Sequence, residues 1–349
     1  MLVLLTACTQ GGSAARTPSP HSSIDVSAAA SQPRSSNASP PIVPSVVSAA
    51  GGSGLNCLLP IRWLLDSGPH DGLFQAGFIS FPSLRVVPDS SVPLNSLFYD
   101  RAFSRWLQVG RSQVSPDGRR YAYTEGTITD NKMSKVHVVD IATGADRVIA
   151  TSRSFDAVVD FGAQGIYLTL AELDAYAVGL WRLDPAGGTP RLISSTILDP
   201  SVGGGAAWGL GFNPADPTPQ HQGAILNSQN RVLRYDLSTG KPTPWFYRSG
   251  AWVSVWGFDG AGRPIVGVDL QVAELWVLSS STRATRIFQS TREFTVPVPD
   301  RFAAIDKQGV WLDATVDLGL SSVWLYRAGS LQNVATFNKW VEVAGGCIP

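Results

Sequence analysis

A strand–turn–strand unit recurs through most of the chain, and this repeat constrains the fold more than any other feature of the sequence. Each copy has a turn of the form Asp-x-x-[Thr/Ala/Gly]-Gly. The carboxylate can accept hydrogen bonds from nearby backbone N–H groups, and glycine tolerates a positive φ. The clearest copies are Asp140–Gly144, Asp184–Gly188 and Asp236–Gly240. Ser279 and Arg327 hold the anchor position in two weaker copies, so the anchors follow one another at intervals of 43 to 52 residues.

A second turn precedes each of these by about twenty residues, as in Ser115–Gly118 and 258–262. Alternating strands follow it, for example 120–124 and 165–169. Four short strands in each unit of about 45 residues are the signature of a β-propeller, an all-β fold. We expect six blades, with seven as the alternative if 57–104 holds further strands.

The two ends of the repeat region are expected to share one blade. Strand-like segments at 78–81 and 84–87 near one end, and at 340–343 near the other, are left over from the complete units. A blade built from both ends closes the ring and leaves no open sheet edge. The predicted propeller therefore spans residues 57–349.

One repeat carries a recognisable family motif. The segment Val114–Tyr123, which reads Val-Ser-Pro-Asp-Gly-Arg-Arg-Tyr-Ala-Tyr, is similar to the Ser-Pro-Asp-Gly repeat of TolB-type propellers. This resemblance implies a propeller on an exported bacterial protein. Propellers serve many functions, so the resemblance by itself assigns none.

The amino-terminal part of the chain differs sharply in composition. All 11 Trp, 8 Tyr and 14 Phe lie within 57–349, whereas 9–56 is rich in Ser, Ala, Pro and Gly. Such a segment cannot bury enough apolar surface to offset its ordering entropy, so we expect 9–56 to be a disordered linker.

Residues 1–8 are expected to be the remnant of a signal. The sequence Leu5-Thr6-Ala7-Cys8 resembles the lipobox of bacterial lipoproteins, which implies that Cys8 is lipidated. The protein would then be exported and lipid-anchored on the outer side of a bacterial membrane, at the cell surface or in the periplasm.

The chain has three cysteines. If Cys8 carries lipid, Cys57 and Cys347 remain, one at each end of the aromatic-rich region. An even number of cysteines outside the cytosol favours a disulfide. We therefore predict a Cys57–Cys347 bond that locks the closing blade.

Charge narrows the range of partners. The 27 basic residues balance the 27 acidic ones, which argues against nucleic acid, because that affinity depends on Lys and Arg neutralising phosphates. No apolar run reaches the ~20 residues of a membrane-spanning helix, so the lipid would be the only membrane contact. We expect a monomer that binds a protein or a component of the cell envelope.

Polar side chains recur where the predicted second strand of each unit ends. Glu125, Asn227, Asp269 and Asp313 share this register, with Thr169 in the remaining unit. Their oxygen atoms could ring the mouth of the channel and hold a hard cation such as Ca²⁺. Lactonases of the gluconolactonase type resemble this arrangement, which makes a metal-dependent lactonase-like hydrolase the alternative function. Polar residues that simply mark the contact of strand ends with solvent would explain the same pattern.

The leading expectation is a non-enzymatic propeller that binds a protein, a cell-wall component or a glycan, or serves as a scaffold. No Gly-x-Ser-x-Gly elbow is present, and beyond a Ca²⁺ ion no cofactor is expected. His137, on a predicted strand, is interpreted as structural. The recurring tryptophans, such as Trp208 and Trp276, are interpreted as packing between blades, with a carbohydrate platform as the alternative.

Overall fold

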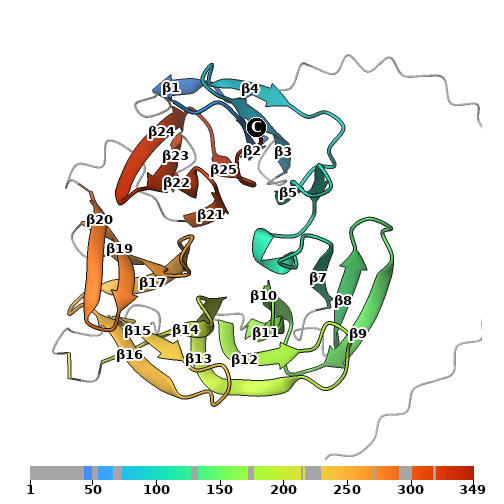
Figure 1. The fold of residues 1–349 in the computed structure, drawn as a ribbon, viewed down its shortest axis with the longest axis vertical. Coiled ribbons are helices and arrows are strands. Elements are labelled where there is room, and N and C mark those ends of the chain that lie inside the picture. The colour runs from blue at the N-terminus through green and yellow to red at the C-terminus, as the bar shows by residue number, and fades with distance from the viewer. Residues whose placement is uncertain are drawn as a thin grey trace, which may run out of the picture. The chain divides into compact units, whose positions relative to one another are not determined.

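The computed structural model shows a folded unit that spans Ile42–Pro349. It describes residues 43–48, 54–65, 73–126, 133–171, 177–213, 215–216, 229–269, 272–290, 301–316 and 320–349. Apart from the short 3₁₀ helix η1 (Arg111–Gln113), every element in these ranges is a β-strand. The sheets follow one another around a ring (Figure 1). The all-β prediction is therefore confirmed.

Strands from both ends of the folded unit share one sheet. The carboxy-terminal strand β25 (Val341–Val343) pairs with β2 (Leu58–Leu64), which is followed by β3 (Phe74–Ser80) and β4 (Arg85–Pro88). The register places Ile61 opposite Val343 and Trp63 opposite Val341. Strands from near both ends of the folded unit therefore build the closing sheet.

The remaining sheets are antiparallel and follow chain order. The sheet after the closing one is β5 (Phe98–Asp100) with β6 (Arg105–Leu107). Then comes β7 (Arg120–Glu125), β8 (Ser134–Asp140) and β9 (Asp146–Ser152). A seven-stranded sheet holds β10 (Ala157–Gly162), β11 (Gly165–Ala171), β12 (Ala177–Leu183), β13 (Arg191–Gly203), β14 (Ala206–Gly211), β15 (Arg231–Tyr235) and β16 (Pro242–Tyr247).

Two further sheets complete the ring. One contains β17 (Trp252–Phe258), β18 (Pro264–Asp269), β19 (Ala273–Ser280) and β20 (Arg283–Gln289). The other contains β21 (Arg301–Asp306), β22 (Gly309–Val316), β23 (Leu320–Arg327), β24 (Ser330–Phe337) and β1 (Val46–Ser48). These sheets are compatible with six blades, and the blade number stays a prediction.

The recurring turns form as their sequences predict. In the first Asp-x-x-Thr-Gly turn, Asp140 Oδ1 accepts the Thr143 N–H at 2.9 Å, and in the third, Asp236 Oδ1 accepts the Thr239 N–H at 2.8 Å. In the Ser-Pro-Asp-Gly turn the Ser115 hydroxyl donates to Asp117 Oδ1 at 2.6 Å and accepts the Arg120 N–H at 2.9 Å. Each turn therefore stabilises its hairpin through local hydrogen bonds.

One long strand in the middle of the chain takes part in two hairpins. The chain runs through β13 without a break, and the second half of this strand pairs with β14. Gly204 and Gly205 form the turn between β13 and β14. Gly204 has φ +59°, and a Cβ atom there would lie 2.2 Å from the Gly262 carbonyl oxygen. Trp208 is consequently on the strand after this turn, where it pairs with both β13 and β15.

The folded unit also begins earlier in the chain than the sequence indicates. β1 lies inside the range 9–56 that was assigned to the linker, and it pairs with β24. The Ser45 N–H donates to Asn338 Oδ1 at 2.9 Å, and Leu55 is buried in the core beside the closing sheet. β1 covers the outer edge of β24, which would otherwise expose unpaired backbone groups.

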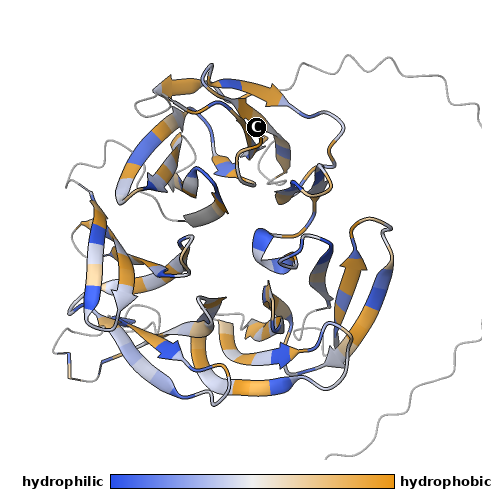
Figure 2. Cartoon of the chain, viewed as in Figure 1, coloured by the Kyte–Doolittle hydropathy of each residue, from blue (hydrophilic) through white to orange (hydrophobic). Residues whose placement is uncertain are grey.

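Apolar residues pack in the spaces between neighbouring sheets, and Figure 2 shows them on strands all around the ring. The largest cluster joins the closing sheet to the β21–β24 sheet through Trp63, Trp311 and Phe337, all fully buried. Trp208 is buried in the cluster between β14–β15 and β17–β19, and Trp276 packs against the same cluster. These contacts support the interpretation of the tryptophans as packing between blades. In the part of the chain that the structure describes, no helix is long and apolar enough to cross a membrane.

Candidate functional site

The residues of the predicted cation ring have different surroundings in the structure. Glu125, at the end of β7, is exposed and pairs with Lys135 Nζ at 2.8 Å. Asp269, the last residue of β18, is also exposed. Asp313 is only 5% exposed, and its Oδ2 accepts the backbone N–H of Val343 at 3.0 Å. Asp313 thus helps to hold β25 in the closing sheet.

Glu125, Asp269 and Asp313 do not form a cluster, because the described residues contain no group of three or more His, Cys, Asp or Glu side chains able to hold a metal. Thr169 is buried and donates to the carbonyl oxygen of Gly179 at 2.9 Å. Asn227 lies outside the described residues. The four-residue ring and its Ca²⁺ ion therefore stay a prediction.

His137 on β8 lies between two carboxylates. Its Nδ1 is 2.9 Å from Asp146 Oδ1, and its Nε2 is 3.3 Å from Glu125 Oε2. The imidazole stacks on Tyr123 with 4.6 Å between the ring centroids. Burial, assisted by the hydrogen bond to Asp146, raises the pKa of Tyr123 to about 12. These contacts tie β7, β8 and β9 together and agree with the structural role expected for His137.

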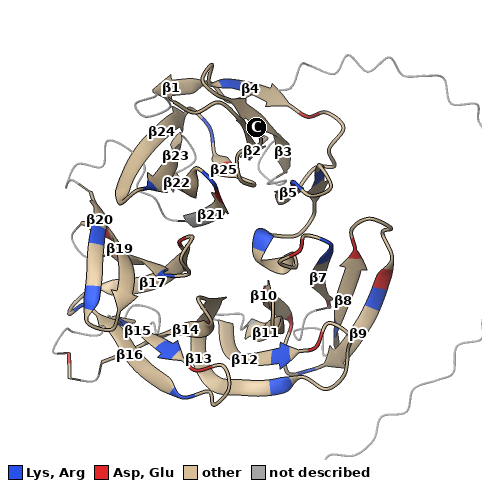
Figure 3. Ribbon diagram, in the orientation of Figure 1, with Lys and Arg blue, Asp and Glu red and all other residues tan. Residues whose placement is uncertain are grey.

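A polar cavity in the structure was not indicated by the sequence. It has a volume of about 390 Å³ and lies beside the closing sheet, where β5, η1, the Ser115–Gly118 turn, β21 and Gly346 meet. Figure 1 shows β5, β7 and β21 on the inner side of the ring, and Figure 3 shows basic and acidic segments close together near β5 and β7. Four charged side chains line the cavity: Asp100, Arg101, Arg111 and Asp117.

Asp100 is the buried acid of this cavity. It ends β5, is 4% exposed, and its Oδ1 accepts the Ala102 N–H at 3.0 Å across the turn to β6. Its Oδ2 is buried and has no hydrogen-bond partner among the described residues. Burial raises the pKa of Asp100, and the Ala102 N–H and the positive charge of Arg111 oppose the rise. Asp100 thus lines the cavity and has one carboxylate oxygen that lacks a partner among the described residues.

The two arginines of the cavity have different environments. Arg111, on η1, donates to the carbonyl oxygen of Val114 at 3.1 Å and has its guanidinium 5.8 Å from the centroid of the Phe98 ring. Arg101 lies in the exposed turn after β5 and makes no hydrogen bond or ion pair with any described residue. Burial raises the pKa of Asp160 on β10 to about 7, against the positive charge of Arg111.

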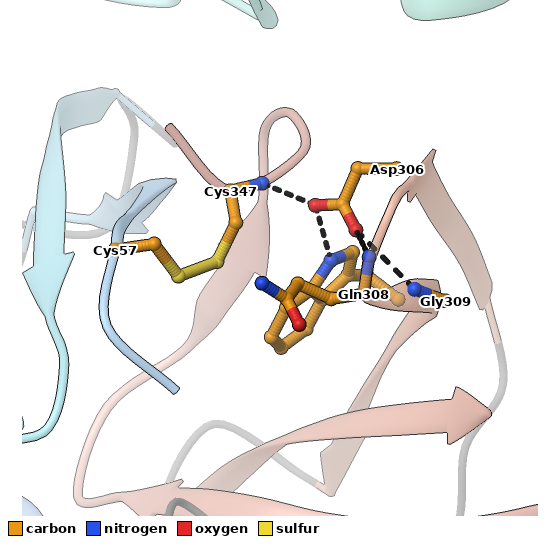
Figure 4. Close-up of a disulfide and its surroundings, with 6 residues drawn as sticks. Cys57, Asp306, Gln308, Gly309 and Cys347 are labelled. Atoms are coloured by element: carbon orange, nitrogen blue, oxygen red, sulfur yellow. Dashed lines mark hydrogen bonds between the residues drawn. A yellow bond between two sulfur atoms is a disulfide. The ribbon is translucent and has the colours of Figure 1, made fainter. Parts of the chain in front are cut away.

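The disulfide and Asp306 adjoin two residues of the cavity wall, Ile305 and Gly346. Cys57 and Cys347 are bonded, with their Cα atoms 5.6 Å apart, which confirms the predicted bond. Asp306, next to the cavity-lining Ile305, accepts hydrogen bonds from the Cys347 backbone N–H and from Trp311 Nε1, the latter at 2.9 Å (Figure 4). A Cβ atom on Gly346 would lie 2.9 Å from Asp306 Cβ, so only glycine fits there.

Comparisons with known proteins found similarity to solved structures. No protein-family model matches it, and no curated protein matches it. Among solved structures it is similar to TolB from Acinetobacter baumannii, with 12% identity over 82% of this chain and 67% of TolB, at a TM-score of 0.49. It is also similar to an acylaminoacyl peptidase, with 9% identity over 79% of this chain and 46% of the peptidase, at a TM-score of 0.46.

A third similar structure is the β-propeller domain of the Trilobed protease from Pyrococcus furiosus, with 10% identity over 79% of this chain and 81% of that domain, at a TM-score of 0.44. At these identities the likeness concerns the fold alone. The antiparallel sheets around a ring, closed by strands from both ends of the folded unit, define the class of the protein as a β-propeller.

Proposed function

We propose that this protein is an exported, membrane-anchored β-propeller that acts as a binding module without catalysis and takes a small polar ligand in the cavity beside its closing sheet. The observation that carries the proposal is that Asp100 lines this cavity and that its buried Oδ2 atom has no hydrogen-bond partner among the described residues. A buried acceptor without a partner costs about 1–3 kcal/mol, and a ligand that donates a hydrogen bond would remove this cost.

The construction of the cavity supports a binding role. Its volume of about 390 Å³ falls in the range of about 300–1,000 Å³ that is usual for small-molecule sites. Four separate segments of the chain meet there, and local hydrogen bonds fix the two turns, at Asp100 and at Ser115. The site is therefore preformed, which lowers the entropic cost of ordering it around a ligand.

A panel of small polar probes with hydrogen-bond donors, such as amines, amino sugars and amino acids, tests the cavity. We expect at least one probe to raise the melting temperature of the wild type by several degrees, since a ligand at a hundred times its Kd stabilises the folded state by about 2.7 kcal/mol. Asp100→Asn should abolish this shift. Asp184→Asn, in an exposed turn away from the cavity, is the matched control. Equal shifts in the wild type and Asp100→Asn, or no shift with any probe, would refute the proposal.

Export and anchoring form the second part of the proposal. The Cys57–Cys347 disulfide supports an oxidising compartment, because such bonds are rare in the cytosol. Cys8 lies outside the described residues, and its sequence context carries the proposal of lipidation. Two or more acyl chains give a stable anchor, since each buried CH₂ group contributes about 0.8 kcal/mol.

Detergent phase partitioning of the full-length protein from its native host tests the anchor. We expect the wild type to enter the detergent phase and Cys8→Ser to stay in the aqueous phase. If both proteins stay in the aqueous phase, the lipid anchor is ruled out, while the cavity proposal is unaffected.

A further inference from the structure

We propose that the cavity recognises a small zwitterion of the size of an amino acid or a dipeptide, with its ammonium group on Asp100 and its carboxylate on Arg101 and Arg111. This inference rests on the proposed function, because it names the ligand class of the same cavity. It follows from which charged groups of the cavity are already engaged within the protein and which are still available.

Asp100 is the available acid of the cavity. The other lining acid, Asp117, accepts the Ser115 hydroxyl at 2.6 Å and the Arg119 N–H at 3.1 Å, both through Oδ1, and its side chain is exposed, so water can serve its second oxygen. Asp100 uses Oδ1 within its own turn, and Oδ2 has no partner among the described residues. A charge-assisted hydrogen bond from an ammonium group is about twice as strong as a neutral one. A protonated amine is therefore a better partner for this buried oxygen than a hydroxyl group.

The guanidinium groups supply the opposite charge. Arg101 has no hydrogen-bond or ion-pair partner among the described residues, so all its N–H donors are available to a ligand. The Phe98 ring and the Val114 carbonyl hold Arg111 in place, and one of its N–H groups is engaged. The planar guanidinium matches the two oxygens of a carboxylate, which makes arginine the residue best suited to bind this group.

The cavity contains both a negatively charged and a positively charged group, so it favours a ligand that carries a positive and a negative charge. A simple amine would leave Arg101 without a partner, and a simple carboxylate would leave the Asp100 oxygen without one. Phe98, Val114 and Ile305 also line the cavity and offer an apolar wall to a side chain. A volume of about 390 Å³ limits the ligand to an amino acid or a very short peptide.

Calorimetric titration of the disulfide-intact protein with three matched probes tests the inference. The twenty amino acids and dialanine are first compared by thermal shift. The compound with the largest shift is then titrated, together with two derivatives of it. The amide lacks the carboxylate, and the N-acetyl form lacks the ammonium group. We expect a Kd below about 1 mM for the zwitterion and at least tenfold weaker binding for both derivatives.

Single substitutions assign the two ends of the ligand. Asp100→Asn should weaken the zwitterion and the amide at least tenfold and leave the N-acetyl form unchanged. Arg101→Gln should weaken the zwitterion and the N-acetyl form and leave the amide unchanged. Arg101 is exposed in its turn, so this variant should fold like the wild type, as circular dichroism and the melting temperature would show.

The outcomes separate this inference from the proposed function. If the amide binds as tightly as the zwitterion, or an amino sugar alone binds and depends on Asp100, the zwitterion inference is wrong and the binding function stands. If no probe binds at all, both are wrong.

Discussion

Replacing both Cys57 and Cys347 by serine is expected to lower the free energy of unfolding by about 5 kcal/mol, the largest effect we expect from one linkage in this chain. The bond spans 290 residues, and the loss of entropy that a cross-link imposes on the unfolded chain grows with the length of the closed loop. Both residues are buried in the cluster that joins the closing sheet to its neighbour, so the serine hydroxyls would add a burial cost.

Denaturant unfolding followed by tryptophan fluorescence measures this effect. The midpoint should fall to a similar extent when the wild type is treated with dithiothreitol and when both cysteines are replaced. The double variant should not respond to dithiothreitol, which provides the internal control. If the reduced wild type unfolds at the same denaturant concentration as the oxidised protein, the disulfide does not stabilise the closure.

The architecture could be predicted because its determinants are local. A turn such as Asp140–Gly144 forms through bonds within five residues, so its sequence is sufficient to identify it. Repetition of such turns at a propeller period then indicates the fold. The closing sheet followed from the same logic, since the leftover segments at both ends could complete only a shared sheet. The position of Cys57 and Cys347 at these two ends made their pairing predictable as well.

Structural features that have no local sequence pattern could not be predicted from the sequence. β5 and β6 have three residues each, too few for an alternating pattern to show, so the hairpin that carries Asp100 was not identified. β13 pairs with β12 in its first part and with β14 in its second, although no local pattern in the sequence indicates so long a strand, and Asp199 lies within it with φ 47°.

Two residues of the candidate ring show that a shared position in the repeat does not give side chains the same surroundings. Glu125 and Asp313 occur at similar places in the sequence repeat, but one is exposed and the other is buried against β25. The surroundings of each strand end depend on the neighbouring sheet, and the closing sheet has no counterpart elsewhere in the ring. The cavity arises at the same irregular place, where the β5–β6 hairpin departs from the repeat.

Replacing Asp306 by alanine is expected to lower the free energy of unfolding by about 3 kcal/mol, the second large effect that we expect. A buried hydrogen-bond donor that is left unpaired costs about 1–3 kcal/mol. This substitution leaves two such donors without an acceptor, the Cys347 N–H and Trp311 Nε1. Cys347 and Trp311 are 1% and 0% exposed, so water cannot replace the lost acceptor. The N–H groups of Gln308 and Gly309 lose their shared acceptor too.

Two comparison variants separate this account from a general effect of losing a charge. Asp306→Asn keeps one carbonyl oxygen and should lose about half as much stability as Asp306→Ala, because it can satisfy one pair of donors but not both. Asp184→Ala, which removes a hydrogen bond to the Ala186 N–H in an exposed turn, should cost less than about 1 kcal/mol. An Asp306→Ala protein as stable as Asp184→Ala would contradict the assignment of Asp306 as the residue that holds the closure.

The same variant connects stability to binding. Asp306 accepts a hydrogen bond from the Cys347 N–H, and the adjacent Gly346 lines the same cavity as Asp100. If the closure shapes the site, Asp306→Ala should weaken the binding of a cavity ligand even though Asp100, Arg101 and the disulfide are all retained. Unchanged affinity in a destabilised Asp306→Ala protein would show that the β5 turn and η1 form the site without the closing wall.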